Sequence, residues 1–227
     1  MSKPTIVLVH GGFVDGGGWR KVYDELTRDG YPVRVVQNAT KSLADDAATT
    51  RQILDGVEGD AVLVGHSYGG AVITEAGTHE KVTALVYITA FAPDKDESVN
   101  TLIAGFPQDA PQPPILPPIN GYLFLDRAKF HDSFAADLLT PDATFLADSQ
   151  VPWGLDALGG PITNPAWRTK PSWYLHVTDD KMIPPPAQLS MAERIGATLA
   201  QTPGSQAIYI SQPTAVANLI RTAAEAT

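Results

Sequence analysis

The residues best suited to chemistry form the pentapeptide Gly-His-Ser-Tyr-Gly at positions 65–69. An apolar run at residues 61–64 precedes it, and the apolar residues 71–73 follow it. A serine between glycines at a junction of strand and helix is typical of a nucleophile elbow, a strained turn that exposes the serine hydroxyl. Glycine suits both sides because a Cβ atom there would collide with the packed strand and helix. We therefore predict that Ser67 is a catalytic nucleophile; the alternative is a tight turn without chemical function.

A second glycine-rich segment, Val-His-Gly-Gly-Phe at positions 9–13, ends an earlier apolar run. A backbone N–H group of Gly12 or Phe13, together with that of Tyr68, would form an oxyanion hole for a tetrahedral intermediate. The alternative is the phosphate-binding loop of a dinucleotide site. The glycine spacing does not match Gly-x-Gly-x-x-Gly, and Gln37 rather than an acidic residue ends the next apolar run. We therefore expect no cofactor.

The elements that must position these residues alternate between short apolar runs and longer segments with helical spacing, which is typical of a parallel sheet covered by helices. Strands are predicted at residues 5–9, 32–36, 61–65, 82–88, 172–177 and 197–201. Helices are predicted at residues 17–29, 43–56, 68–79, 125–139, 186–196 and 213–226. We predict an α/β fold with a mainly parallel sheet of about six strands flanked by helices.

The length of 227 residues suits a single domain, here residues 1–227. Between about residues 92 and 170 the alternation of strands and helices breaks, and prolines crowd residues 107–118. Such a run forms neither a regular helix nor an inner strand. We expect residues 92–170 to be an insertion that lies over the edge of the sheet as a lid.

Three motifs, in this order along the chain, resemble the α/β-hydrolase family: residues 9–13, residues 65–70, and Thr-Asp-Asp-Lys-Met-Ile-Pro-Pro at residues 178–185. The sequence looks most like small bacterial carboxylesterase-like hydrolases, and it is similar also to plant methyl-ester esterases and hydroxynitrile lyases. The resemblance implies the α/β-hydrolase fold, with a sheet that begins at the family's third strand. It also implies a triad of Ser67, an acid and a histidine, with Asp180 rather than its neighbour Asp179 as the acid.

The sequence departs from this family at the position of the catalytic histidine, where it has Gln206 within Gly-Ser-Gln-Ala. An amide can hydrogen-bond both Asp180 and Ser67, but it cannot take up and return a proton near neutral pH. We therefore expect a serine carboxylesterase-like hydrolase for small hydrophobic esters, with an acyl-enzyme mechanism, that is severely impaired or inactive as written. Two origins of Gln206 stay open: substitution in an active esterase, and a natural protein that binds without turnover.

None of the five histidines stands where the base of the triad belongs. His10 and His66 are interpreted as hydrogen-bonded structural rings, and His176 as a buried strand residue. His79 and His131 are expected to be solvated.

Aromatic residues of the lid, above all Phe106, Phe124 and Trp153, would line an apolar pocket over Ser67, unless they form a core of the lid itself. Such a pocket would take a small, neutral, hydrophobic molecule. An alternative function is therefore a protein that holds such a ligand without catalysis. A hydroxynitrile-lyase-like enzyme is a weaker alternative, because it too requires the missing base.

The composition excludes several other partners and sites. Asp and Glu number 25 against 16 Lys and Arg, and a net charge of -9 disfavours nucleic acid and anionic membranes as partners.

The chain has no cysteine, its histidines lack metal-ligand spacing, and we expect no metal. The paired acids Asp45 and Asp46 are interpreted as helix-start charges. The first apolar run is too short for a signal sequence or a membrane span, so we expect a cytoplasmic protein whose oligomeric state the sequence does not predict.

Overall fold

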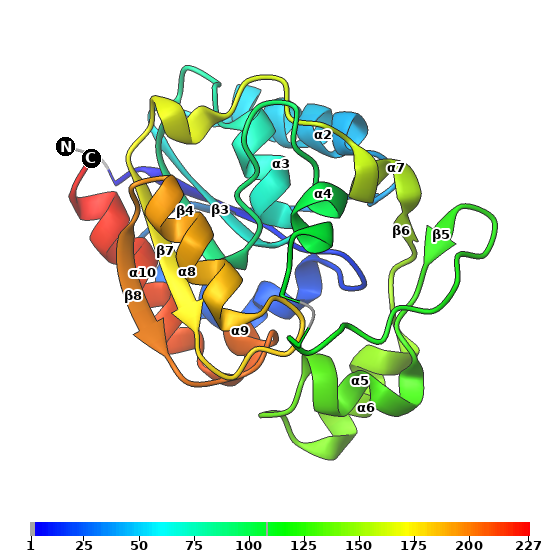
Figure 1. The fold of residues 1–227 in the computed structure, drawn as a ribbon. Helices are drawn as coiled ribbons and strands as arrows, with labels where there is room; N and C mark the ends of the chain where they lie inside the picture. Colours follow the sequence, from blue (N-terminus) through cyan, green and yellow to red (C-terminus); the bar gives the residue numbers. More distant parts are fainter. Residues whose placement is uncertain (1–2, 108) are drawn as a thin grey trace.

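The centre of the fold is a sheet of six parallel strands in the order β2-β1-β3-β4-β7-β8 (Figure 1). The structure is a computed structural model, and it describes residues 3–107 and 109–227. The strands are β1 (Thr5–Val9), β2 (Val33–Val36), β3 (Ala61–Ser67), β4 (Val82–Ala90), β7 (Ser172–Val177) and β8 (Thr198–Thr202). The predicted α/β fold is confirmed, and each predicted strand lies within two residues of the observed one at both ends.

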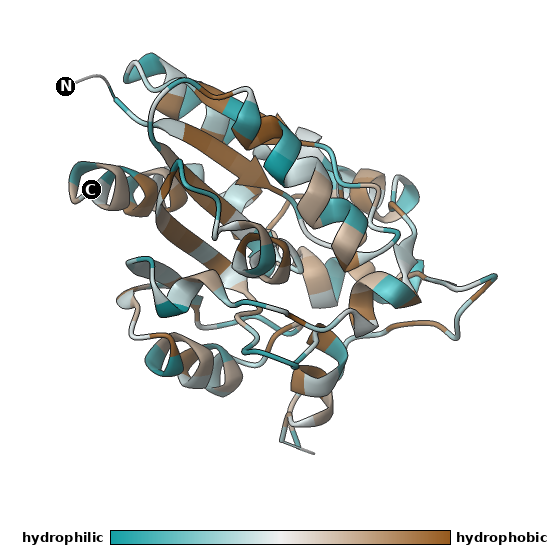
Figure 2. Ribbon diagram, turned by 90° about the horizontal axis from the view of Figure 1, so that it is seen from above, coloured by the Kyte–Doolittle hydropathy of each residue, from teal (hydrophilic) through white to brown (hydrophobic). Residues whose placement is uncertain are grey.

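Helices cover both faces of the sheet, and Figure 2 shows the hydrophobic strands enclosed between them. The helices α1 (Arg20–Arg28) and α10 (Pro213–Glu225) pack on one face, and α2 (Leu43–Asp55), α3 (Gly69–Ala76) and α8 (Pro185–Arg194) pack on the other. Successive residues of β3 point to opposite faces, so Leu63 joins the core beneath α3 while Val62 and Val64 join the core beneath α10. The predicted helix 17–29 begins with a tighter 3-10 turn, η1 (Gly16–Trp19).

Residues 92–170 form short elements between β4 and β7. They are α4 (Val99–Ala104), β5 (Tyr122–Leu123), α5 (Arg127–Phe134), α6 (Thr140–Asp148), β6 (Trp153–Gly154), α7 (Leu155–Gly159) and η2 (Ala166–Arg168). The single helix predicted at 125–139 is wrong, because α5 ends before Ala135 and a second helix begins at Thr140, with Pro141 in its first turn. The proline-rich run forms no helix among its described residues, as expected.

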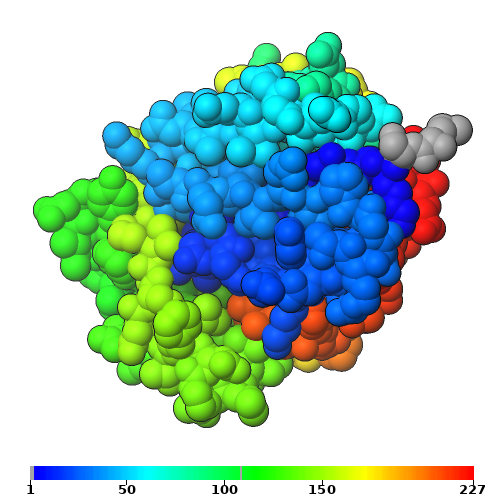
Figure 3. Space-filling view, turned by 180° about the vertical axis from the view of Figure 1, so that it is seen from behind, coloured from blue at the N-terminus to red at the C-terminus, as the bar shows by residue number. Residues whose placement is uncertain are grey.

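This segment, which we call the lid, lies against the amino-terminal part of the chain when the molecule is seen from behind (Figure 3). Phe13 and Val151 connect the two parts through an antiparallel bridge, in which the Val151 N–H donates to the Phe13 carbonyl at 3.1 Å. The division into one domain with a lid at residues 92–170 stays a prediction.

Strand β3 and helix α3 approach each other so closely that only glycine fits between them. A Cβ atom on Gly65 would lie 2.5 Å from the carbonyl oxygen of Gly69 at the start of α3. One on Gly69 would lie 2.6 Å from the carbonyl oxygen of Val9 in β1, so α3 also meets β1 at backbone distance. The atoms met belong to the backbone, so they cannot move aside without displacing a strand or a helix. Ser67, which leads into the turn, has a φ of 54°, a left-handed conformation that is uncommon for residues other than glycine. This close contact is the structural reason for the Gly-x-Ser-x-Gly spacing.

We expect Gly65→Ala to destabilise the protein by about 2 kcal/mol or more, because the new methyl group must push backbone atoms apart. Gly159→Ala is the matched control, since a Cβ there meets no atom within 4 Å, and its effect should stay within about 0.5 kcal/mol. Urea unfolding of the two variants measures the difference. Equal midpoints would contradict the close packing of β3 against α3.

Candidate active site

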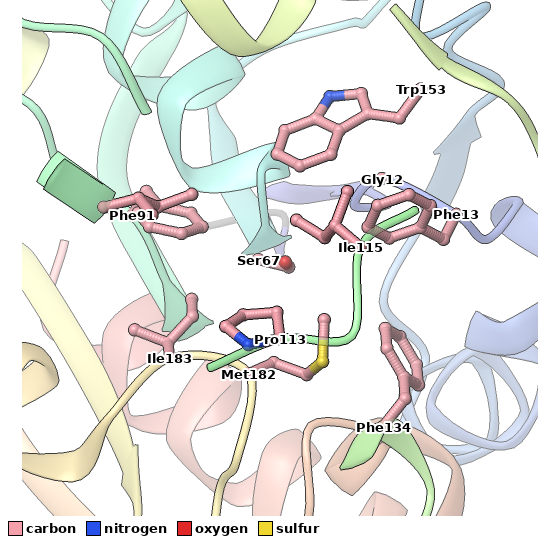
Figure 4. A pocket seen from close by; sticks show the side chains of 11 residues that line it. Gly12, Phe13, Ser67, Phe91, Pro113, Ile115, Phe134, Trp153, Met182 and Ile183 are labelled. Carbon is pink, nitrogen blue, oxygen red and sulfur yellow. The ribbon is translucent and has the colours of Figure 1, made fainter. Parts of the chain in front are cut away.

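Ser67 lies at the carboxyl end of β3, in the middle of the sheet, where open α/β sheets bind their ligands. Its carbonyl oxygen accepts a hydrogen bond of 3.1 Å from the N–H of Phe91, which follows the neighbouring strand β4. The side chain is half-buried, and its hydroxyl faces a cavity beneath the lid (Figure 4). The structure thus presents the serine as a nucleophile elbow would.

Asp180 follows β7 and is almost completely buried. Its Oδ1 accepts hydrogen bonds from the backbone N–H groups of Met182 at 2.7 Å and Ile183 at 3.3 Å. Its Oδ2 accepts from the Gln188 amide at 3.1 Å and from the hydroxyl of Thr89. The carboxyl group is therefore held in one orientation from several sides.

Burial raises the pKa of Asp180 to about 7, because removal from water penalises the carboxylate more than the hydrogen bonds of Thr89 and the backbone favour it. No positively charged group contributes to lowering the pKa of Asp180. Asp179, the other acid of the motif, is exposed and accepts a hydrogen bond of 3.2 Å from the N–H of Gly204. The structure thus brings Asp180, and not Asp179, to the site.

Gln206 fills the space between Ser67 and Asp180 and is fully buried. When its Nε2 faces Asp180, it donates to both carboxyl oxygens, at 3.0 Å to Oδ1, and its Oε1 accepts from the Ser67 hydroxyl at 2.9 Å. The opposite orientation of the amide would set its oxygen against the carboxyl oxygens, so we assign the first. A continuous chain of hydrogen bonds thus runs from serine through amide to carboxyl.

His66 is hydrogen-bonded to the backbone of residue 206. Its Nε2 donates to the carbonyl oxygen of Gln206 at 2.8 Å, and complete burial lowers its pKa to about 3, so the ring is neutral. His10 accepts from the Asn38 N–H at Nε2, at 2.9 Å, and burial lowers its pKa as well. The interpretation of these two histidines as hydrogen-bonded structural rings agrees with these contacts.

The remaining histidines lie elsewhere. His176 is buried on β7, 3.4 Å from the amide oxygen of Gln201, as expected for a strand residue. The expectation that His79 and His131 are solvated is wrong, because both are only half-exposed. His79 contacts Asp55 at 3.1 Å, and the His131 ring lies 3.1 Å from a backbone carbonyl oxygen within the lid. None of the three lines the cavity over Ser67.

An oxyanion hole needs two backbone N–H donors, and the structure offers candidates for both. Tyr68 caps α3, so its N–H belongs to the groups at a helix start that have no partner within the helix. Gly12 lines the cavity beside Ser67. Phe13 also lines it, and its bridge to Val151 uses its carbonyl oxygen, so the second donor is the N–H of either Gly12 or Phe13.

The cavity over Ser67 is apolar and is lined in part by residues of the lid. It offers about 20 Å³ to the centre of a water molecule, which is room for one or two waters. Figure 4 shows the side chains of Ile115 and Pro113, both from the lid, near the Ser67 hydroxyl. The residues that line it are Gly12, Phe13, Ser67, Phe91, Ile103, Pro113, Ile115, Phe134, Trp153, Met182 and Ile183.

Only one of the three predicted lid aromatics, Trp153, lines this cavity. Phe106 instead stacks on Phe91, with ring centroids 6.3 Å apart, and Phe124 lies in a lid segment whose backbone pairs with Leu116. The prediction for Phe106 and Phe124 is therefore wrong. Ile115 fills the cavity where an aromatic residue was expected, and the only sequence signal for it was an apolar residue within the proline-rich run.

Within residues 3–107 and 109–227, no three His, Asp or Glu residues gather in a group that could hold a metal ion. In the same part of the chain, no helix combines the length and the apolar character needed to cross a membrane.

Comparisons with known proteins place the chain. Its sequence matches the alpha/beta hydrolase family over residues 6–219. A pyrethroid hydrolase of Sphingobium wenxiniae is 26% identical over 254 residues, which cover 100% of this chain and 89% of the relative. Methylesterase 8 of Arabidopsis thaliana is 31% identical over 121 residues, or 47% of this chain and 44% of the relative. The crystal structure of polyneuridine aldehyde esterase shares the fold, with a TM-score of 0.82 and 19% identity over 97% of this chain and 98% of that one.

The resemblance inferred from the three motifs is confirmed, and the relatives named here are two esterases and a pyrethroid hydrolase. By the match that extends from β1 to α10, this chain belongs to the alpha/beta hydrolase family.

Proposed function

We propose that this chain is a serine carboxylesterase-type hydrolase whose turnover is blocked at proton transfer. Ser67 is the nucleophile, Asp180 is the acid, and the N–H group of Tyr68, together with that of Gly12 or Phe13, stabilises the oxyanion. The observation that carries the proposal is the Gln206 amide, which bridges the Ser67 hydroxyl and the Asp180 carboxyl in the place of a base. The site has the hydrogen bonds of a triad without a group that can accept the proton.

The chemistry of ester hydrolysis explains the block. When Ser67 attacks the ester carbonyl, its hydroxyl proton must pass to a base, and that proton must later reach the leaving alcohol. The Oε1 atom of Gln206 accepts a hydrogen bond but is far too weak a base near neutral pH. Loss of a triad base costs on the order of 10⁶ in turnover, or about 8 kcal/mol of barrier. Catalysis by the oxyanion donors alone would leave roughly 10³-fold over water.

The cavity favours neutral, hydrophobic esters as substrates. Apart from Ser67, its side chains are hydrocarbon, aromatic or thioether groups, with no charged side chain among them. A pyrethroid hydrolase and plant methylesterases are among the relatives, which supports the same substrate class. The space over Ser67 is narrow for an ester, so we expect residues that line the cavity to shift when a substrate enters.

One observation favours a second candidate, a protein that holds a hydrophobic ligand without catalysis. Gln206 satisfies Ser67 and Asp180 together, so the site leaves neither of these groups unpaired without a histidine. Such a site is stable as a binding cavity. The two candidates differ in whether a histidine at position 206 restores chemistry.

We expect Gln206→His to raise kcat/KM for 4-nitrophenyl acetate by about 10⁴-fold or more, because the imidazole supplies the missing base. Steady-state hydrolysis, followed by nitrophenolate absorbance, measures it. The control is Ser67→Ala on the histidine background, which should remove the gain. A histidine variant no faster than the parent chain would reject the esterase and favour the binding protein.

Asp180 also gives an expectation for stability. Its pKa is about 7 in the folded chain and near 4 when unfolded, so between these pH values the unfolded state releases a proton that the folded state keeps. Folding stability attributable to this group is therefore lost as pH rises from about 4 to 7, by a few kcal/mol in total.

Asp180→Asn removes this titration, so the free energy of unfolding of the parent chain should fall relative to that of the variant as pH rises through this window. Chemical unfolding at a series of pH values measures the gap, and other titrating groups cancel between the two chains. Curves that run parallel from pH 4 to 7 would show that the carboxyl titrates normally.

A further inference from the structure

Asp46 stands at a helix start, as the sequence predicts, but it is not exposed to solvent there. It lies in the first turn of α2, and it is completely buried, whereas its neighbour Asp45 is exposed. Its Oδ2 accepts a hydrogen bond of 2.7 Å from the hydroxyl of Tyr68, and its Oδ1 accepts one of 3.1 Å from the N–H of Thr40. A buried carboxyl that binds two separate segments needs an explanation beyond helix capping.

The first segment is the nucleophile elbow. Tyr68 directly follows Ser67, and its side chain is fully buried. The ring packs beside Trp153, with centroids 5.4 Å apart, and its hydroxyl ends on Asp46. The side chain of Tyr68 is thereby fixed at its far end, which limits how its backbone N–H can turn relative to the serine.

The second segment is the loop that contains Thr40, which holds the cavity residue Trp153 in place. Thr40 has a φ of 52°, which is a strained conformation for a β-branched residue. Its hydroxyl donates to the carbonyl oxygen of Pro152 at 2.7 Å, and its carbonyl accepts from the N–H of Gly154 at 2.7 Å. These two bonds enclose Trp153, the aromatic residue of β6 that lines the cavity. The bond from Thr40 to Asp46 helps to hold this strained loop in place.

We propose that Asp46 is a positioning residue that fixes two walls of the Ser67 site, the Tyr68 oxyanion donor and the Trp153 side of the cavity. It touches neither substrate nor Ser67, and it acts through Tyr68 and Thr40. The inference rests on the proposed function, because it gives Tyr68 a role in catalysis. A carboxylate suits the position because each of its oxygens accepts one of the two donors, whereas an amide has only one oxygen.

The contact of Asp46 with Tyr68 should affect kcat, and its contact with Thr40 should affect KM, so steady-state kinetics separates the two. On the Gln206→His background, Tyr68→Phe should lower kcat about 10-fold with little change in KM, since the donor loses its anchor. Thr40→Val lacks the hydroxyl that binds Pro152, and it should raise KM several-fold with little change in kcat. Asp46→Ala should do both, with a loss in kcat of about 10- to 100-fold, as small misplacements near a reacting group produce.

The double variant Asp46→Ala, Tyr68→Phe tests the coupling, because its kcat should be no lower than that of Asp46→Ala alone. Asp45→Ala, the exposed neighbour, is the control and should keep both constants. Additive losses in kcat, or an Asp46→Ala variant with unchanged kcat and KM, would overturn the inference. If Asp46→Ala does not fold, Asp46→Asn replaces it, and the same cycle with Tyr68→Phe decides.

A second measurement does not depend on activity. In the parent chain, Asp46→Ala should speed amide hydrogen exchange at Gly154, whose N–H binds Thr40, and in the first turn of α3, while exchange in β7 stays unchanged. An inactive Gln206→His variant together with this exchange pattern would reject the proposed function and keep Asp46 as the support of both segments. Unchanged exchange at both segments would reject the role of Asp46 itself.

Discussion

The close contact of β3 with α3 is the constraint on which the rest of the site depends. Because Gly65 lets β3 and α3 meet at backbone distance, and Gly69 does the same for α3 and β1, the chain between β3 and α3 must turn sharply, and Ser67 takes a left-handed conformation at the edge of the sheet. The parallel strands β7 and β8 end at the same edge, so Asp180 after β7 and the loop with Gln206 after β8 converge on the serine. The sheet brings Ser67, Asp180 and Gln206 close together, and hydrogen bonds orient their side chains.

The electrostatics of the site follow from the identity of residue 206. A histidine would become a cation during turnover and would pair with the buried carboxyl. The neutral amide of Gln206 gives hydrogen bonds without charge, and burial is the largest influence on the pKa of Asp180, which it raises. His66 cannot take over the role, because burial lowers its pKa to about 3 and makes the ring too weak a base, and its Nε2 already donates to the backbone of residue 206. The fold therefore keeps the geometry of the site, whereas the single residue Gln206 removes its capacity for proton transfer.

The fold and the position of Ser67 follow from sequence because they depend on local rules: apolar runs of strand length and glycines where backbones touch. Asp180 and the role of position 206 are predicted only through the resemblance to a known family. The lid does not follow from such rules. Which side chain of the lid reaches Ser67 depends on how its segments pack together, so Ile115 lines the cavity while Phe106 and Phe124 do not. Burial of Asp46 was missed for the same reason, since two adjacent acids at a helix start look alike in sequence and only tertiary packing puts one inside.

The most direct test of the missing base is the rate at which a fluorophosphonate labels Ser67, followed by intact-mass spectrometry with peptide mapping. This single step requires the nucleophile, the oxyanion donors and the base, but no release of product. With only the base absent, the parent chain and the Gln206→His variant are labelled at the same serine, and the parent reacts at least about 10³-fold more slowly. A parent chain labelled as fast as the variant would contradict the assignment of position 206 as the base.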